Sequence, residues 1–309
     1  TGTGEIGSTI TILDNGTSIG TAVVGTGGTW TFTPTTDLGQ GLHPITVTST
    51  DAAGNVSAPS AGFSVNVDTL TTAPVISSVT DNVGTPAPVI SGVPTNDNTP
   101  TFTGTAEPNS TITISENGKV IGTALVDGTG NWNFTPNPAL TDGSHNLTII
   151  TTDTAGNVST ATTFNAVIDT AAPVVPAITL VVDDQTQVGV DNPLTNGQLT
   201  KDIQPAISGT SEANAIITIK DGTTVLGTTT ASPTGDWSFT PDSGHALGQG
   251  SHNLTVTATD AAGNISNPSS VFTVVVDSVA PTAPLIVTVT DNTAPNIGPI
   301  TSGQPTNET

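Results

Sequence analysis

The sequence predicts an all-β protein built from antiparallel β-sandwiches. Short runs rich in Thr, Val and Ile alternate between polar and apolar residues, which is the pattern of strands with one buried face. Turn residues separate these runs, with 33 Gly and 23 Pro among 309 residues. No stretch of the sequence has the periodicity of a helix. Together these observations favour sandwiches of short strands.

Several motifs recur at intervals of about a hundred residues, so the chain is a tandem repeat. Trp-x-Phe-Thr-Pro, Gly-Thr-x-Glu and Asp-x-Ala-Gly-Asn-(Val/Ile)-Ser each occur three times, and a His keeps the same period. A repeat of this length suits an immunoglobulin-like (Ig-like) sandwich. The expected domains are 1–70, which would be truncated at its N-terminus, 71–171, 172–279, and 280–309, which would hold the first strand and loop of a further domain.

The middle repeat is expected to form seven strands. In chain order they are Val75–Thr80, Pro100–Ala106, one marked by Ile112 and Ile114, Val120–Leu125, Asn131–Thr135, His145–Thr151 and Thr162–Ile168. In the second strand, Phe102 alternates inward. Asn117-Gly118 supplies a hairpin turn between the third and fourth strands. Trp132 and Phe134 fall on one face of the fifth strand, which makes this Trp a core residue in preference to an exposed, sugar-stacking one.

Short linkers join the expected domains. Residues 169–173 and 277–281 contain Pro and no Gly, which indicates stiff connections. We therefore expect the domains to form an extended rod. In the tail, residues 285–290 are expected either to be disordered or to pair head-to-tail with the first domain of a neighbouring molecule.

The chain is strongly acidic, with 25 Asp and Glu against three basic residues and a formal charge of −22. Nucleic acids and anionic membranes need a basic footprint, so neither is an expected partner, and no apolar run is long enough for membrane insertion. Multivalent cations are expected instead, because carboxylates, amides and carbonyls are hard oxygen ligands. Disorder is the competing explanation of the acidity, and the regular strands and turns argue against it. Without Cys, no disulfide can clamp the domains.

Strand alternation brings acidic residues to one end of each domain. The loop between the second and third strands carries Glu107, and the loop between the sixth and seventh carries Asp153 and Asn157. Both loops lie where the domain begins, beside the preceding linker and its Asp68. This convergence predicts a junction site for Ca²⁺, which takes six to eight oxygen ligands. The matching residues are Asp169, Glu212, Asp260 and Asn264 at the second junction, Glu5, Asp51 and Asn55 in the first domain, which has no preceding linker, and Asp277 in the last linker.

A second calcium site is expected in the long loop between the first and second strands. Its candidate ligands are Asp81, Asn82 and Asp97 in the middle domain, Asp183, Asp184, Asp191 and Asp202 in the third, and Asp291 in the tail. The alternative to calcium binding is that these residues only shape their own loops. An Asp such as Asp153 can cap its own loop through an Asx-turn, with Asn157 in a left-handed position. That alternative does not explain why a Glu and a linker Asp fall at the same end.

The sequence offers little support for catalysis. It contains no His-Glu-x-x-His, no nucleophile elbow, no phosphate-binding loop and no Cys. His43, His145 and His252 occupy the same place in every repeat, at the start of the sixth strand, which suits packing or hydrogen bonding. We therefore expect a protein that is not an enzyme.

Four motifs together resemble the bacterial Ig-like repeats of giant type I-secreted adhesins. They are Gly-Thr-x-Glu, Trp-x-Phe-Thr-Pro, Asp-x-Ala-Gly-Asn-(Val/Ile)-Ser, and a linker with Val-Asp-Thr followed by Ala-Pro. The resemblance covers nearly the whole chain. It implies tandem Ig-like domains, calcium at or near the junctions, secretion to the cell surface, and attachment to a host-cell or other surface receptor. Two other functions stay open: an array of glycan-binding modules, and accessory domains of an exported glycosidase.

Overall fold

Strands are the only regular elements in the part of the chain that the computed structural model describes, which is residues 1–185, 192–295 and 297–306. The all-β prediction is thereby confirmed. The chain divides into two units, Thr1–Ala171 and Ala172–Thr309. Within the described ranges there is no helix that could cross a membrane.

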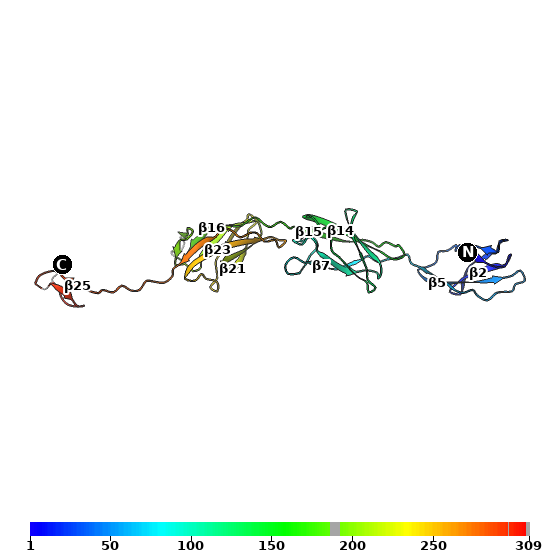
Figure 1. Ribbon diagram of the computed structural model, residues 1–309, viewed down its shortest axis with the longest axis horizontal. Helices are drawn as coiled ribbons and strands as arrows, with labels where there is room; N and C mark the ends of the chain where they lie inside the picture. Colours follow the sequence, from blue (N-terminus) through cyan, green and yellow to red (C-terminus); the bar gives the residue numbers. More distant parts are fainter. Residues whose placement is uncertain (186–191, 296, 307–309) are drawn as a thin grey trace. The chain divides into compact units, whose positions relative to one another are not determined.

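The middle repeat is a sandwich of two sheets whose strands pair antiparallel, with one exception. One sheet has the order β13 (Asn131–Phe134), β10 (Thr101–Thr105), β7 (Val75–Asp81) and β8 (Ala87–Pro88). The other has the order β12 (Lys119–Leu125), β11 (Thr111–Glu116), β14 (Gly143–Thr152), β15 (Thr162–Ile168) and β9 (Pro94–Thr95). The exception is the short β9, which pairs in parallel with β15. Figure 1 shows β14 beside β15, with which it pairs along its length. All seven predicted strands are present; the short β8 and β9, inside the long loop, were not predicted.

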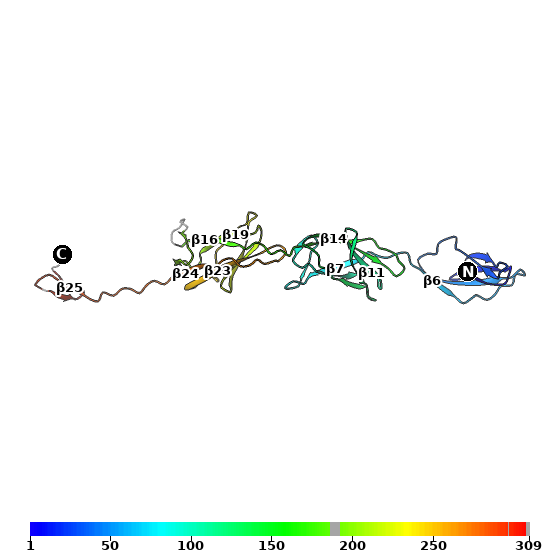
Figure 2. The ribbon, with the colours of Figure 1, turned by 45° about the horizontal axis from the view of Figure 1, so that its top comes forward.

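The third repeat has the same layout. Its first sheet contains β17 (Asn192–Pro193), β16 (Ala177–Asp183), β19 (Ala206–Thr210) and β22 (Asp236–Phe239). Its second sheet contains β18 (Leu199–Thr200), β24 (Phe272–Val276), β23 (Gly250–Thr259), β20 (Ile216–Asp221) and β21 (Thr224–Thr230). Figure 2 shows β16 next to its partner β19. The same strand order in two repeats supports the sequence period.

The first repeat holds one full sheet and one small one. The full sheet has the order β3 (Thr17–Val23), β2 (Thr9–Asp14), β5 (Gly41–Thr50) and β6 (Phe63–Val67). The small sheet contains only β1 (Gly2–Thr3) and β4 (Thr29–Trp30). In the tail, β25 (Val289–Asp291) pairs with β26 (Gly298–Ile300), while residues 285–288 belong to no strand. The expected strand exchange through residues 285–290 stays a prediction.

Aromatic residues pack among the aliphatic residues in the core of the middle sandwich. Phe102 is 1% exposed, and its ring centroid lies 6.3 Å from that of Phe134 and 5.4 Å from that of Phe164. Trp132 is 3% exposed and belongs to the same buried cluster. The repeated Trp is therefore a core residue here, as it is at Trp237, which is 4% exposed.

Gly104 gives the Gly-Thr-x-Glu motif its packing role. The register of β10 against β7 shifts between Thr103 and Gly104, which brings the two backbones close together. A Cβ on Gly104 would clash with the backbone oxygen of Val75 and would lie 2.6 Å from the Trp132 ring. Only Gly fits between the neighbouring strand and the Trp side chain.

Replacing Gly104 by Ala is expected to lower the free energy of unfolding of the middle domain by about 1–3 kcal/mol, because the added methyl overpacks the core. Thermal unfolding followed by calorimetry measures this loss. Gly128→Ala is the matched control, since a Cβ there meets nothing within 4 Å. If the melting transition of Gly104→Ala is unchanged, β7 and β10 can move apart without a loss of stability.

Candidate metal centre

The repeated Asp-x-Ala-Gly-Asn loop is closed by its own Asp. In the middle repeat, one carboxylate oxygen of Asp153, Oδ1, accepts hydrogen bonds from the backbone N–H groups of Ala155 and Asn157, both at 2.8 Å. The other, Oδ2, accepts one from Nδ2 of Asn157 at 2.7 Å. Gly156 adopts a positive φ of 94°, which suits Gly at the tip of the turn. The local Asx-turn interpretation of Asp153 is therefore correct, but the expected left-handed position falls on Gly156 and not on Asn157.

The other two copies of this loop have the same construction. Asp51 accepts from the backbone N–H of Ala53 at 2.9 Å and from that of Asn55 at 2.8 Å, and its second oxygen accepts from Nδ2 of Asn55 at 2.8 Å. Asp260 and Asn264 repeat the arrangement, with an amide-to-carboxylate distance of 2.9 Å. The motif thus determines a loop geometry in every repeat.

At the loop of the middle repeat, two further carboxylates join Asp153. Asp68 follows β6, Glu107 follows β10, and one ligand oxygen from each of these residues and from Asp153 lies within 4.8 Å of the others. Asp153 is buried and the other two are partly buried. This is the meeting of linker, second-to-third loop and sixth-to-seventh loop that strand alternation predicts. Among the described residues, no other group of three or more acidic, His or Cys side chains comes together in this way.

Neighbouring side chains orient the cluster. Asn157 donates through Nδ2 to the backbone oxygen of Asp68 at 3.0 Å, in addition to its bond with Asp153. Thr71 donates its hydroxyl to Oε2 of Glu107 at 2.9 Å. Gln40 donates through Nε2 to Oδ1 of Asp68 at 2.7 Å. In this arrangement, Asn157 ties the loop to the linker as a donor, whereas the sequence prediction gives it the role of an oxygen ligand.

Electrostatics keep Asp153 ionised. Burial raises the pKa of its carboxyl group, but the hydrogen bonds from the side chain and backbone of Asn157, and from the backbone of Ala155 and Gly156, outweigh burial and hold the pKa below its usual value. The cluster therefore contains a charged carboxylate beside two more acidic groups, in a chain with a formal charge of −22. Like charges at this separation repel one another unless a cation lies between them.

The remaining junction residues stay predictions. Asp169 belongs to the first of the two units, and Glu212, Asp260 and Asn264 belong to the second. Asp169 accepts from the backbone N–H of Ala171 at 3.1 Å. Glu5, Asp51 and Asn55 form no group of three acidic side chains in the described part of the first repeat. The last linker residue, Asp277, accepts from Nε2 of Gln249 at 2.7 Å.

In the middle repeat, the long-loop aspartates hold their own loop together. Asp97 is 2% exposed; one of its carboxylate oxygens accepts from the backbone N–H of Asn82 at 2.7 Å and the other from that of Thr99 at 2.8 Å. Asp81 accepts from the hydroxyl of Thr95 at 2.7 Å. These oxygens already have donors, so the structure gives Asp81, Asn82 and Asp97 a role in shaping the loop. Their predicted calcium binding stays untested.

The third long loop and the tail repeat this pattern. Asp183 accepts from the hydroxyl of Thr200 at 2.7 Å, and Asp202 accepts from the backbone N–H groups of Asp184 and Gln204. Burial raises the pKa of the Asp202 carboxyl group. Asp291 accepts from the backbone N–H of Thr293 at 2.9 Å. Asp191 lies outside the described residues.

Gln40 and Gln249 are linker-binding residues that sequence reasoning missed. Each donates through Nε2 to a linker Asp. The Oε1 atom of each Gln accepts from the backbone N–H of the residue after that Asp, which is Thr69 for Gln40 and Ser278 for Gln249. In the sequence, the two Gln residues share only a Gly-Gln-Gly motif, whose last Gly lies two residues before the repeated His. The second repeat has Asp142 at this position, and Asp142 accepts from the backbone N–H of Thr170 at 3.0 Å.

Comparison with known proteins identifies related sequences. The family model described as "Bacterial Ig-like domain" matches residues 1–69, 91–170 and 174–278. Exoglucanase B of Cellulomonas fimi is 30% identical over 266 residues, which cover 82% of this chain and 22% of that protein. The chain therefore spans only about 22% of the length of this curated relative.

The chain also matches several solved structures at low sequence identity. A 1.5-MDa bacterial ice-binding adhesin is 21% identical, with 87% of each chain covered and a TM-score of 0.38. A Ca²⁺-stabilized adhesin, with which an Antarctic bacterium binds ice, is 24% identical, with 88% of this chain and 66% of that chain covered and a TM-score of 0.33. The fibronectin(III)-like modules of Clostridium thermocellum CbhA are 14% identical, covering 64% of this chain and 93% of that one, with a TM-score of 0.39.

Proposed function

Because the chain belongs to the family of bacterial Ig-like domains, we propose that its repeats are calcium-rigidified extender domains of a secreted bacterial surface adhesin that attaches to host cells or other surfaces. The repeats provide reach and stiffness, and the receptor is a host-cell surface component or glycan. The protein acts outside the cell, on the bacterial surface, and without catalysis.

The cluster of Asp68, Glu107 and Asp153 is the observation that supports this proposal. Its oxygens come from the linker and from two loops of the following repeat, so a cation bound there would tie the linker to the sandwich. Ca²⁺ fits the donor set best, because it accepts several carboxylate oxygens in flexible geometry. Mg²⁺ demands near-ideal octahedral geometry and dehydrates reluctantly.

Calcium binding of this kind would make the joints between repeats rigid outside the cell and leave them flexible inside it. A cation that binds only the folded state stabilises it by mass action. Extracellular modules typically bind Ca²⁺ with dissociation constants of about 10⁻⁴–10⁻³ M, so sites of this class fill outside the cell. Before secretion, when calcium is scarce, the joints would stay loose, which suits export through a narrow channel.

Calcium is expected to raise the melting temperature of the intact chain, with a stabilisation of about 2.7 kcal/mol per site when its concentration is a hundred times the dissociation constant. Calorimetric melting in EDTA and in Ca²⁺ measures the effect, isothermal titration gives the affinity, and Mg²⁺ serves as the comparison ion. Small-angle scattering in both conditions tests rigidity. Identical melting and scattering with and without Ca²⁺ would refute the calcium proposal.

The alignment with Exoglucanase B favours a second candidate, an accessory array of an exported glycosidase. In such an array the repeats would space a catalytic domain from its substrate or would hold glycan. Titration of the intact chain with cello-oligosaccharides separates the two candidates. Saturable binding would support the glycan-binding form, and a glycosidase domain in the same polypeptide would support the accessory role.

A further inference from the structure

A His near the start of each long strand is held between two oxygen acceptors. In the middle repeat, Nδ1 of His145 lies 2.8 Å from Oε1 of Glu116, and Nε2 lies 2.7 Å from the backbone oxygen of Thr141. Glu116 is the last residue of β11, and Thr141 lies in the loop that leads into β14. The ring thus fastens this loop to the end of the neighbouring strand.

The other two repeats have the same arrangement. Nδ1 of His43 lies 2.6 Å from Oδ2 of Asp14, and its Nε2 lies 2.7 Å from the backbone oxygen of Gly39. Nδ1 of His252 lies 2.7 Å from Oδ2 of Asp221, and its Nε2 lies 2.8 Å from the oxygen of Gly248. Each carboxylate ends the strand that pairs with the long strand of the His.

Two acceptors require two donors. A neutral imidazole has one N–H, so it can satisfy either the carboxylate or the loop carbonyl, but not both. The doubly protonated ring satisfies both, and its bond to the carboxylate is charge-assisted and correspondingly strong. The side chains of His43, His145 and His252 are 15%, 10% and 12% exposed, so water cannot readily replace the lost partner.

We infer that His43 is a pH-dependent clamp, which closes the loop before its long strand only while its ring carries two protons; His145 and His252 occupy the same position between two acceptors in the other repeats. The three His positions involve none of the residues of the Asp68, Glu107 and Asp153 cluster. The His43 clamp would add a second environmental response to the chain, since rising pH opens it whatever the calcium concentration.

The surroundings of the three rings contain few other charges. Across the sheet, the residues paired with His43, His145 and His252 are Val65, Ala166 and Val274, none of which titrates. The charged groups near the clamps are Asp37 in the hollow beside His43, Asp142 next to Thr141, Lys119 opposite Glu116, and Lys220 next to Asp221. The carboxylate that touches each ring is therefore its main electrostatic partner.

The direction of the pH effect follows from His43. Its hydrogen bond to Asp14, and then its bond to the Gly39 carbonyl, raise the pKa of the His43 ring above 6.5. A group whose pKa is raised by folding stabilises the fold fully below its unfolded pKa. That stabilisation is lost as the pH rises through the folded pKa. The clamp thus weakens as the pH rises through the raised pKa of His43.

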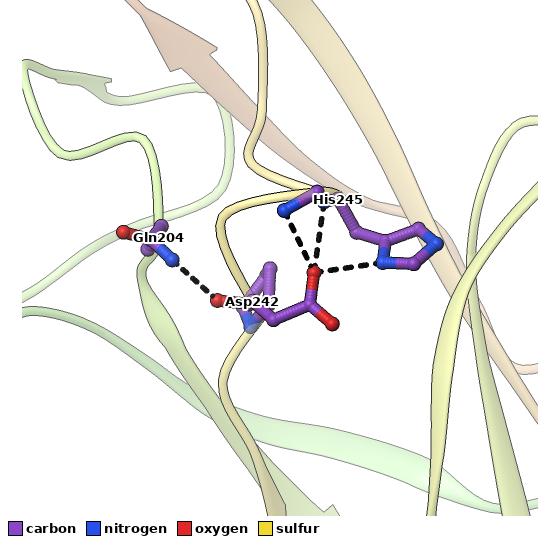
Figure 3. A network of polar contacts seen from close by, with 5 residues as sticks. Gln204, Asp242 and His245 are labelled. Carbon is purple, nitrogen blue, oxygen red and sulfur yellow. Dashed lines mark hydrogen bonds and ion pairs between the residues drawn. The ribbon is translucent and has the colours of Figure 1, made fainter.

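Long-range ¹⁵N–¹H NMR of the His rings in the intact chain tests this inference directly. The ring of His43 is expected to keep protons on both nitrogens to a higher pH than a free imidazole does. His245 is the internal reference, because it is 48% exposed and uses Nδ1 alone, which lies 2.8 Å from Oδ1 of Asp242 (Figure 3). A His43 ring that loses its second proton at the pH at which a free imidazole does would overturn the inference.

Melting in EDTA provides the second readout. The melting temperature is expected to be about 4–8 °C lower at pH 9 than at pH 6, the shift typical of losing one modest interaction in a domain of this size. Asp14→Asn keeps an oxygen acceptor but removes the charge, so His43 is expected to lose its proton at lower pH. Asp242→Asn, beside the exposed His245, is the matched control. Equal effects of Asp14→Asn at pH 6 and pH 9 would indicate a purely structural contact and would refute the clamp.

Discussion

Phe102→Ala is expected to lower the free energy of unfolding of the middle domain by about 3–5 kcal/mol. Phe102 lies between the rings of Phe134 and Phe164, so its truncation removes buried area and two aromatic contacts and leaves a cavity. Such a loss is a large part of the 5–15 kcal/mol that stabilises a typical domain. Calorimetry of the intact chain should show one transition moving sharply downward.

The third repeat supplies the control for this substitution. Ile207 pairs with Phe239 as Phe102 pairs with Phe134, and Ile207 is fully buried in its own core. Phe102→Ile therefore places in the middle core a residue that the same architecture already accepts. It is expected to cost clearly less than Phe102→Ala. Equal losses from both variants would mean that aromatic contact, and not cavity volume, dominates the stability of this core.

The strands could be predicted because their signal is local. Alternating β-branched and polar residues, the Asn117-Gly118 turn and the Trp132 and Phe134 pair each depend on neighbours in the sequence, and all lie where they were expected. The short strand β9 could not be predicted this way. It exists because Pro94 and Thr95 pair in parallel with the distant β15, and two residues carry no periodicity of their own.

The cluster of Asp68, Glu107 and Asp153 could be predicted in outline because strand direction is enough to place loops. Alternation puts Glu107 and Asp153 at the same end, and the linker brings Asp68 there. The orienting groups could not be predicted. Gln40 acts through one side-chain bond to Asp68, and the donor role of Asn157 depends on which way its amide faces. Neither property leaves a pattern in the sequence.

Asp153→Ala is expected to remove both the loop closure and the calcium response of the middle domain. The backbone N–H groups of Ala155 and Asn157 lose their acceptor, at a cost of about 1–3 kcal/mol for a buried donor left unsatisfied. In Ca²⁺ the variant also loses the stabilisation that a bound cation supplies, about 2.7 kcal/mol at a hundredfold excess over the dissociation constant. Melting in EDTA and in Ca²⁺ separates the two losses.

Asp51→Ala is the matched control, because Asp51 makes the same loop bonds and belongs to no cluster of three carboxylates in the described residues. It should cost loop stability in the first repeat and leave the calcium response of the middle domain intact. Glu107→Gln tests the calcium affinity of the cluster without changing the loop. It keeps an oxygen for the hydroxyl of Thr71 and removes one charge from the cluster, so the affinity for Ca²⁺ should fall about tenfold, equivalent to about 1.4 kcal/mol, with the loop unchanged. If Asp153→Ala and Asp51→Ala respond alike to calcium, the repeated loop is a turn and the cation is held elsewhere.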